Sequence, residues 1–238
     1  MSDADWYNHR VKHLLLPPTE KRKQFELRAL GLRDFAGVTA GQPLDPFELA
    51  RFAKLMVVDF DQIRDLSPES RAHLLGPAAE DWSGGACSQP LPNGWRIVIL
   101  NPLHGSQRNR ATLMEEIAHV FLGHKPNRLA AIVAPAKQET SPTPSRKSEA
   151  AKTSDTSKTA GRMMARDYNQ ADEEAAYAIG AAALVPYGSL RSQVVSGRTA
   201  QEIARHFRVS RQLAEYRIKV THLWAEYKGT SAARTEHV

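Results

Sequence analysis

The strongest constraint on the fold is a helical pattern over residues 112–123. Its apolar residues recur at the spacing of an amphipathic helix and should form the buried face: Leu113, Ile117, Val120 and Phe121. Gly123 follows the last of them and is placed to end the helix. We therefore expect a single helix in the middle of the chain, with one face packed against other elements.

Three ionisable residues on this helix suggest a metal-binding or catalytic site. Glu115 and His119 are four residues apart, so their side chains project one turn above each other. Glu116 lies about 100° round the helix from Glu115. A zinc-peptidase helix has the form His-Glu-x-x-His, in which both histidines bind the metal and the glutamate is the general base. This chain has Glu-Glu-x-x-His, a pattern that ordinary solvated helices also contain.

The composition is that of a soluble globular protein. The chain has 238 residues, enough for one large or two small domains, with 42% hydrophobic and 24% charged residues. No apolar run approaches the roughly 20 residues of a membrane helix, and the leucines after His13 are too few for a signal peptide. Cys87 is the only cysteine, which excludes an intrachain disulfide and a cysteine-rich zinc site. We expect a cytoplasmic protein with no membrane contact.

The chain carries a moderate excess of positive charge. Lys and Arg number 32 against 26 Asp and Glu, and the isoelectric point is about 9.5. This balance permits contact with nucleic acid, but the basic residues are scattered, so simple solvation explains them equally well.

Several helices are expected before residue 112. Residues 20–30 have a helical pattern that the Gly and Pro residues between 31 and 43 interrupt. Asp45, followed by Pro and Glu, is a typical N-cap, and this helix is expected to continue through Met56. Ser67 precedes Pro in the same manner and predicts another short helix.

A small sheet is expected between these helices and residue 112. Asn93-Gly94 is a tight-turn signal, and residues 95–100 are rich in β-branched and aromatic side chains. We expect two antiparallel strands there, with residues 57–58 as the start of a further short strand, and a loop over 104–110. An extended substrate could add to an edge strand of such a sheet, or the sheet could be purely structural.

The second half of the chain begins with a biased segment and a helix. Residues 135–161 are rich in Pro, Ser, Thr, Lys and Ala without aromatic residues, which predicts a mobile insertion. The alanine-rich stretch 171–185 predicts a helix with Asp172 as N-cap and Pro186 at its end. Glu173 and Glu174 lie in its first turn, where favourable interaction with the helix dipole alone would account for them.

A helical hairpin is expected near the C-terminus. Residues 199–202 form a capping box, and Ser210 begins the next helix. Four arginines lie on or beside this outline of a helix-turn-helix: Arg205, Arg208, Arg211 and Arg217. An ordinary hairpin that reads no DNA has the same outline. The predicted divisions are an extension (1–43), a domain (44–190), the hairpin (191–228) and a tail (229–238).

In this order the segments resemble the ImmA/IrrE family of metallopeptidases. The family has a strand, an Arg-rich loop, the helix His-Glu-x-x-His-x-x-Leu-Gly-His, a variable insertion, Arg-x-Tyr, and a helix ending in Pro that supplies a third ligand. The corresponding segments here lie between about residues 45 and 225: 97–101, 108–110, 115–124, 166–168, 173–186 and the hairpin. Two positions depart from the pattern, namely Glu115 for the first histidine and Ala175 for a glutamate.

The resemblance implies an α+β fold, mostly helical with a small antiparallel sheet, a zincin-like metallopeptidase core and a helix-turn-helix-like C-terminal hairpin. It also implies Glu115, His119 and Glu173 as metal ligands and Glu116 as general base. The metal would be zinc, or manganese because two carboxylates are hard ligands. The partner would be a protein substrate, in relatives often a transcriptional repressor.

Alternatives to this site and function stay open. Arg110 could pair with Glu115, and His104 could reach the site from the preceding loop. His124 is a poor substitute for a ligand, since it would lie about 140° from His119 on a continued helix. The chain could be a metal-dependent peptidase, a member that has lost catalysis and binds a regulatory partner, or a DNA-associated regulator.

Overall fold

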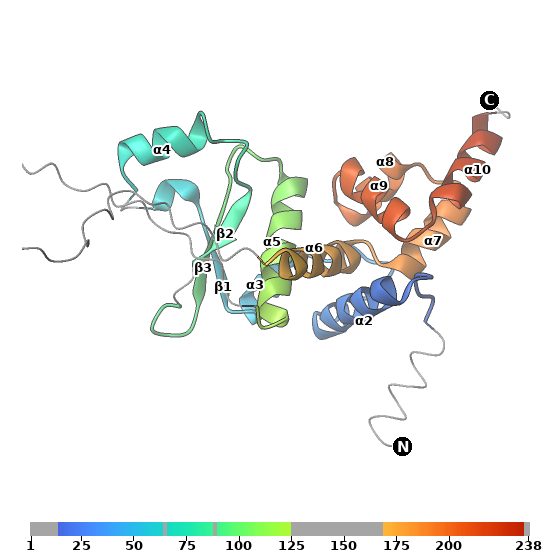
Figure 1. The fold of residues 1–238 in the computed structure, drawn as a ribbon, viewed down its shortest axis with the longest axis horizontal. Helices are drawn as coiled ribbons and strands as arrows, with labels where there is room; N and C mark the ends of the chain where they lie inside the picture. The colour runs from blue at the N-terminus through green and yellow to red at the C-terminus, as the bar shows by residue number, and fades with distance from the viewer. Residues whose placement is uncertain (1–13, 64–65, 88–89, 125–168, 236–238) are drawn as a thin grey trace, which may run out of the picture.

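The computed structural model describes residues 14–63, 66–87, 90–124 and 169–235. For residues 231–235 it describes the backbone alone. The predicted mobile insertion at 135–161 and the Arg-x-Tyr segment at 166–168 lie outside the described residues. Figure 1 shows a small sheet and α4 at one end of the molecule, the helices α7 to α10 at the other, and α5 and α6 between them. Within the described ranges, no helix combines the length and the apolar character needed to cross a membrane.

The sheet has three strands in the order β1-β3-β2, where β1 is Leu55–Val58, β2 is Gly84–Ala86 and β3 is Arg96–Leu100. The predicted antiparallel pairing holds for β2 and β3, but β1 runs parallel to β3. The expectation of a wholly antiparallel sheet is therefore wrong. A parallel neighbour cannot be reached through a hairpin, and the chain returns through η1 (Phe60–Gln62), α4 (Pro68–Leu75) and β2 before it enters β3.

The helix expected to run through Met56 ends earlier. Helix α3 spans Pro46–Phe52, and Lys54 adopts a positive φ of 54°, which breaks the helix before β1. Met56 consequently lies in β1. The start of α3 is as predicted, since the Asp45 carboxylate accepts a hydrogen bond from the amide of Phe47 at 3.0 Å.

Helix α5 (Ser106–Phe121) contains the expected helix and begins six residues before residue 112, so Arg108 and Arg110 lie on a helix and not in a loop. Its buried apolar side chains are Leu113, Met114, Ile117 and Ala118. Val120 and Phe121 are 37% and 51% exposed, so the predicted buried face is only half right. Strands β2 and β3 and helices α3 and α6 all pack on α5, and this packing selects its buried face.

Helix α6 (Gln170–Leu184) packs against α5 on one side and α2 (Glu20–Phe35) on the other. Its N-cap is Asn169, whose side chain accepts hydrogen bonds from the amides of residues 171 and 172. The prediction of Asp172 as N-cap is thus wrong. Eight small or apolar residues of α6 between Ala176 and Leu184 are buried, so α6 is the central helix of the core.

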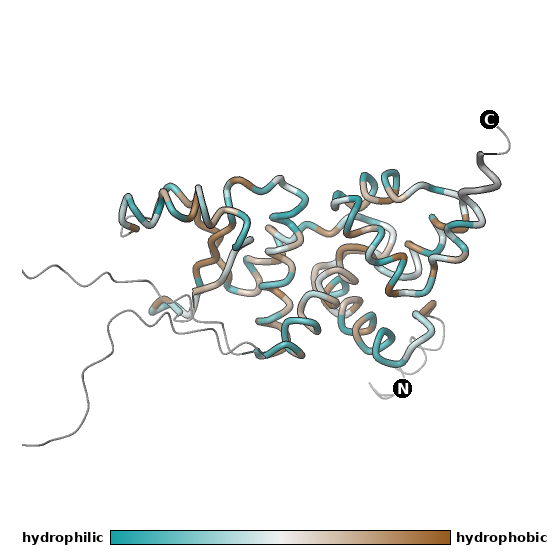
Figure 2. The backbone as a smooth tube through the Cα atoms, turned by 45° about the horizontal axis from the view of Figure 1, so that its top comes forward, coloured by the Kyte–Doolittle hydropathy of each residue, from teal (hydrophilic) through white to brown (hydrophobic). Residues whose placement is uncertain are grey.

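The C-terminal part is a group of four helices: α7 (Tyr187–Val195), α8 (Ala200–Phe207), α9 (Arg211–Val220) and α10 (Trp224–Thr235). The predicted capping box at Thr199 and Glu202 and the Ser210 cap are both present. The domain boundaries stay a prediction, but a single hydrophobic cluster extends from Ala29 to Leu223 across them. Figure 2 shows hydropathy alternating along the helices, as expected for elements with one buried face.

Two buried arginines connect the helices. Arg217 of α9 donates to a Glu26 carboxylate oxygen of α2 at 2.6 Å and to the carbonyl of Val185 at 3.0 Å. The other Glu26 oxygen accepts a hydrogen bond from the amide of Tyr187. Arg33 of α2 donates to the carbonyl of Ala183 at 2.7 Å. These contacts fasten α2, the junction of α6 and α7, and α9 to one another.

Candidate metal centre

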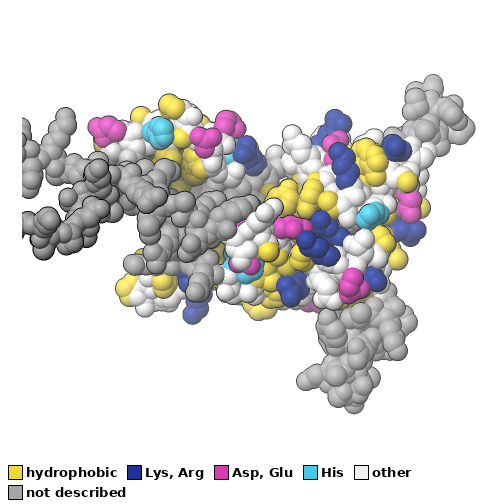
Figure 3. All heavy atoms as spheres, viewed as in Figure 1, with side chains coloured by type: hydrophobic (Ala, Val, Ile, Leu, Met, Phe, Trp, Pro, Cys, Tyr) yellow, Lys and Arg dark blue, Asp and Glu magenta, His cyan; other side chains and the backbone are white. Residues whose placement is uncertain are grey.

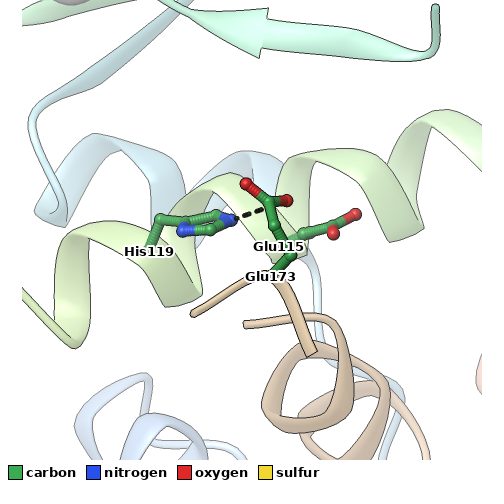
Figure 4. A group of neighbouring side chains, drawn as sticks. All are labelled: Glu115, His119 and Glu173. Carbon is green, nitrogen blue, oxygen red and sulfur yellow. Dashed lines mark ion pairs between the residues drawn. The ribbon is translucent and has the colours of Figure 1, made fainter. Parts of the chain in front are cut away.

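Three of the predicted site residues lie together in the structure. Glu115 and His119 come from successive turns of α5, and Glu173 comes from the first turn of α6 (Figure 4). One ligand atom from each lies within 4.8 Å of the others, and the His119 Nε2 is 3.6 Å from a Glu173 carboxylate oxygen. All three side chains are half-buried.

The two glutamates at the start of α6 have different surroundings. Glu173 lies beside His119 of α5, whereas Glu174 pairs with Lys21 of α2 at 2.7 Å. Helix-dipole compensation would act on both alike. Because consecutive residues on a helix point about 100° apart, one residue faces each neighbouring helix. Glu173 is the one that α6 brings to α5.

The approach of α6 to α5 depends on Gly180. A Cβ atom at this position would lie 3.2 Å from the carbonyl oxygen of Met114 and 3.3 Å from the amide nitrogen of Glu115. These are backbone atoms of the helix that carries two of the three site residues, so a larger side chain would push the helices apart.

We expect Gly180→Leu to lower the unfolding free energy by about 1–3 kcal/mol, the usual range for overpacking a core, and to weaken metal binding. Gly31→Leu is the matched control, because Gly31 also lies in a helix but has no atom within 4 Å of an added Cβ. Urea unfolding and metal titration of both variants measure the effect. Equal stability of the two variants would contradict the assigned close contact.

The environment favours a neutral His119. Burial lowers the pKa of His119 below its ordinary value and His124 adds to this, while the Glu173 carboxylate opposes it. The neutral imidazole is the form that binds metals. One turn beyond Glu173, burial and then the neighbouring Tyr216 and Glu115 raise the pKa of Tyr177. Its hydroxyl therefore keeps its proton at neutral pH and can serve as a hydrogen-bond donor.

His124 lies closer to the site than the helical geometry predicted. Gly123 has a φ of +69°, and the amide of His124 donates back to the carbonyl of His119 at 3.0 Å. This turn returns the His124 ring to His119, with 3.0 Å between the two Nδ1 atoms. The expected angle of about 140° assumed a continued helix. The signal for the correct position was Gly123, which favours a left-handed helix end.

The other residues considered for the site lie outside the group of three ligand residues. Glu116 is half-buried beside Glu115 on α5 and is not among the three residues whose ligand atoms converge. His104 does not belong to this group either. The Arg110 guanidinium donates to the carbonyls of Leu44 and Arg208 and to Asp45, which links α3, α5 and the turn before α9.

The donor set fits a divalent metal. Two ligands each about 2.1 Å from a tetrahedral ion lie about 3.4 Å apart. The His119 and Glu173 atoms are already 3.6 Å apart, and no two of the three ligand atoms are more than 4.8 Å apart. An imidazole with two carboxylates offers three protein ligands, the number found in catalytic zinc sites with an open position.

The comparison with known families bears on α6 and the helices after it. Residues 155–219 match the IrrE N-terminal-like domain, Peptidase_M78. The predicted resemblance to the ImmA/IrrE family is confirmed. The matched segment includes α6 with Glu173, then α7, α8 and most of α9. Neither the curated proteins nor the solved structures contain a match to the chain.

The IrrE-like match begins at residue 155, so α5 lies outside it. Glu173 is therefore inside the matched segment, whereas Glu115 and His119 are joined to it by the fold. The match suggests a hydrolase of the metallopeptidase type, and the Glu-His-Glu group is compatible with the divalent metal that such a protein needs.

Proposed function

We propose that this protein is a metal-dependent endopeptidase of the ImmA/IrrE type that cleaves or regulates a protein partner. The observation that carries the proposal is the convergence of Glu115, His119 and Glu173 within 4.8 Å on α5 and the IrrE-like helix α6. These three residues would hold the metal.

Each residue then has a distinct role. A divalent ion held by Glu115, His119 and Glu173 would supply Lewis acidity to the scissile carbonyl and to water. Glu116 accepts the proton of the attacking water and delivers it to the leaving amine. His119, kept neutral by burial, presents a lone pair, and the hydroxyl of Tyr177 supplies a donor beside Glu115.

The substitution at Glu115 changes the charge of the site. Glu, His and Glu carry two negative charges, one more than His, His and Glu. The extra charge neutralises more of the ion's field and weakens its Lewis acidity. Oxygen donors also move the preference from zinc towards manganese or a similar ion.

The edge of the sheet offers a place where a protein substrate, such as a transcriptional repressor, could bind. Strand β2 pairs with β3 and lies at the edge of the sheet next to α5. An extended peptide segment could add, through main-chain hydrogen bonds, to the side of β2 on which no described strand lies. This supports an endopeptidase acting on an unfolded or loop segment of its partner.

Metal content of the purified protein tests the proposal. We expect near-stoichiometric metal, measured by mass spectrometry, and its loss in His119→Ala. Glu115→His should bind zinc more tightly than the wild type, because it replaces one of the two carboxylates with the softer imidazole. A wild type without metal, together with a Glu115→His variant that binds zinc, would favour a regulatory protein that has lost catalysis.

The DNA-associated alternative has weaker support. Arg217 is 2% exposed and forms the Glu26 ion pair, so three of the four arginines expected to contact DNA are exposed: Arg205, Arg208 and Arg211. Figure 3 shows basic side chains interspersed with acidic ones on the face in view. Binding to duplex DNA that weakens steeply with salt would favour this alternative, since phosphate contacts release counterions.

A further inference from the structure

We propose that His124 and Asp172 position His119 for metal binding by accepting the hydrogen that its ring carries on Nδ1 when Nε2 binds the metal. This inference rests on the proposed metal centre and assigns roles to two residues outside the ligand group. A chain of contacts connects them: His119 Nδ1 lies 3.0 Å from His124 Nδ1, and His124 Nε2 lies 3.5 Å from an Asp172 carboxylate oxygen.

The two facing nitrogens permit only limited proton arrangements. At 3.0 Å they form a hydrogen bond, so one Nδ1 carries a hydrogen and the other presents a lone pair. If His124 were the donor, the lone pair on its neutral ring would be on Nε2 and would face the Asp172 carboxylate. Two electron-rich groups would then lie 3.5 Å apart.

The opposite arrangement leaves a lone pair on His119 Nε2, which faces the Glu173 carboxylate at 3.6 Å, and a metal ion between these two groups would turn that repulsion into attraction. His119 Nδ1–H donates to His124 Nδ1, and His124 Nε2–H donates to Asp172. The Nε2 of His119 is then free of its hydrogen, and this is the atom that lies 3.6 Å from Glu173 in the candidate metal centre. Metal-binding histidines generally donate their second ring nitrogen to a supporting acceptor, which fixes both tautomer and orientation.

The fold places these supporting residues by separate means. Gly123 ends α5 in a left-handed turn that returns His124 to the helix it has just left, where the two rings pack edge to face with centroids 5.1 Å apart. Asp172 lies in the first turn of α6, one residue before Glu173. The same helix start thus supplies one carboxylate to the ligand group and another to His124.

Two substitutions at His124 separate hydrogen bonding from packing. His124→Phe keeps a ring against His119 but removes the acceptor, whereas His124→Asn removes the ring and keeps an acceptor oxygen. We expect roughly 10–100-fold weaker zinc binding in His124→Phe, the usual effect of losing such a supporting residue, and recovery of most of that loss in His124→Asn. His73→Asn is the control, because His73 is an exposed histidine of α4.

Nitrogen-15 NMR of the histidine rings gives a second test that needs no activity. We expect His119 to carry a hydrogen on Nδ1 and His124 to lack one there in the zinc-loaded protein. An unprotonated Nδ1 on His119, or unchanged zinc affinity in His124→Phe, would overturn the inference. A wild type that binds no zinc or manganese would refute the metal centre and this inference with it, whereas bound zinc with an unprotonated His119 Nδ1 would refute the inference alone.

Discussion

Replacing Glu26 with alanine is expected to lower the unfolding free energy by about 3–5 kcal/mol, the typical loss when one partner of a buried ion pair is removed. Glu26 and Arg217 are 1% and 2% exposed. Without the carboxylate, the Arg217 charge stays buried with the carbonyl of Val185 as its neutral partner, and the amide of Tyr187 loses its acceptor. Urea unfolding followed by circular dichroism measures the change.

Two further variants make this prediction specific. Arg211→Ala removes an exposed ion pair with Glu215 on the same helix as Arg217, and should leave the unfolding free energy almost unchanged. The double variant Glu26→Leu with Arg217→Met should lose less stability than the sum of the two single changes, because no buried charge remains uncompensated. A Glu26→Ala variant as stable as Arg211→Ala would show that the pair is unimportant for the fold.

Glu116→Gln is expected to slow peptide hydrolysis by roughly 10²–10⁴-fold, the usual contribution of a general base, while metal content stays unchanged. The amide keeps the size of the side chain but cannot accept a proton. Cleavage can be followed by mass spectrometry on a proteome-derived peptide library incubated with the metal-loaded protein.

Glu174→Gln is the matched control for this measurement. It removes the same charge from a glutamate that pairs with Lys21 and lies away from the ligand group, so hydrolysis should continue at the wild-type rate. Equal cleavage by Glu116→Gln and wild type would exclude Glu116 as the base. Metal-loaded wild type that cleaves no peptide or partner would favour a regulatory function without catalysis.

Local sequence signals determined the starts of several helices. Asp45, Ser67, Thr199 and Ser210 each cap a helix as predicted, because an N-cap needs only a short polar side chain and the amides two or three residues ahead. The four-residue spacing of Glu115 and His119 likewise placed both on one side of α5 before any tertiary contact was known.

Tertiary packing decided what local patterns leave open. Val120 and Phe121 follow the helical pattern of Leu113 and Ile117, yet they are exposed because no described element packs over that end of the face. The parallel strand β1 depends on pairing between residues about 40 positions apart, which carries no local signal. The N-cap of α6 is Asn169 and not Asp172 as predicted, and Asp172 instead pairs with His124.

The sequence by itself determined which residues of α5 and α6 carry the donor atoms, since the 3.6-residue period of a helix sets their relative directions. Only the tertiary structure decided that they meet. Glu173 reaches His119 because Gly180 lets two helix backbones approach, and His124 reaches it because Gly123 reverses the chain. At Gly180 an added Cβ would meet the backbone of α5, a contact that only the packed fold creates, and at Gly123 the φ of +69° is one that residues with a Cβ rarely adopt.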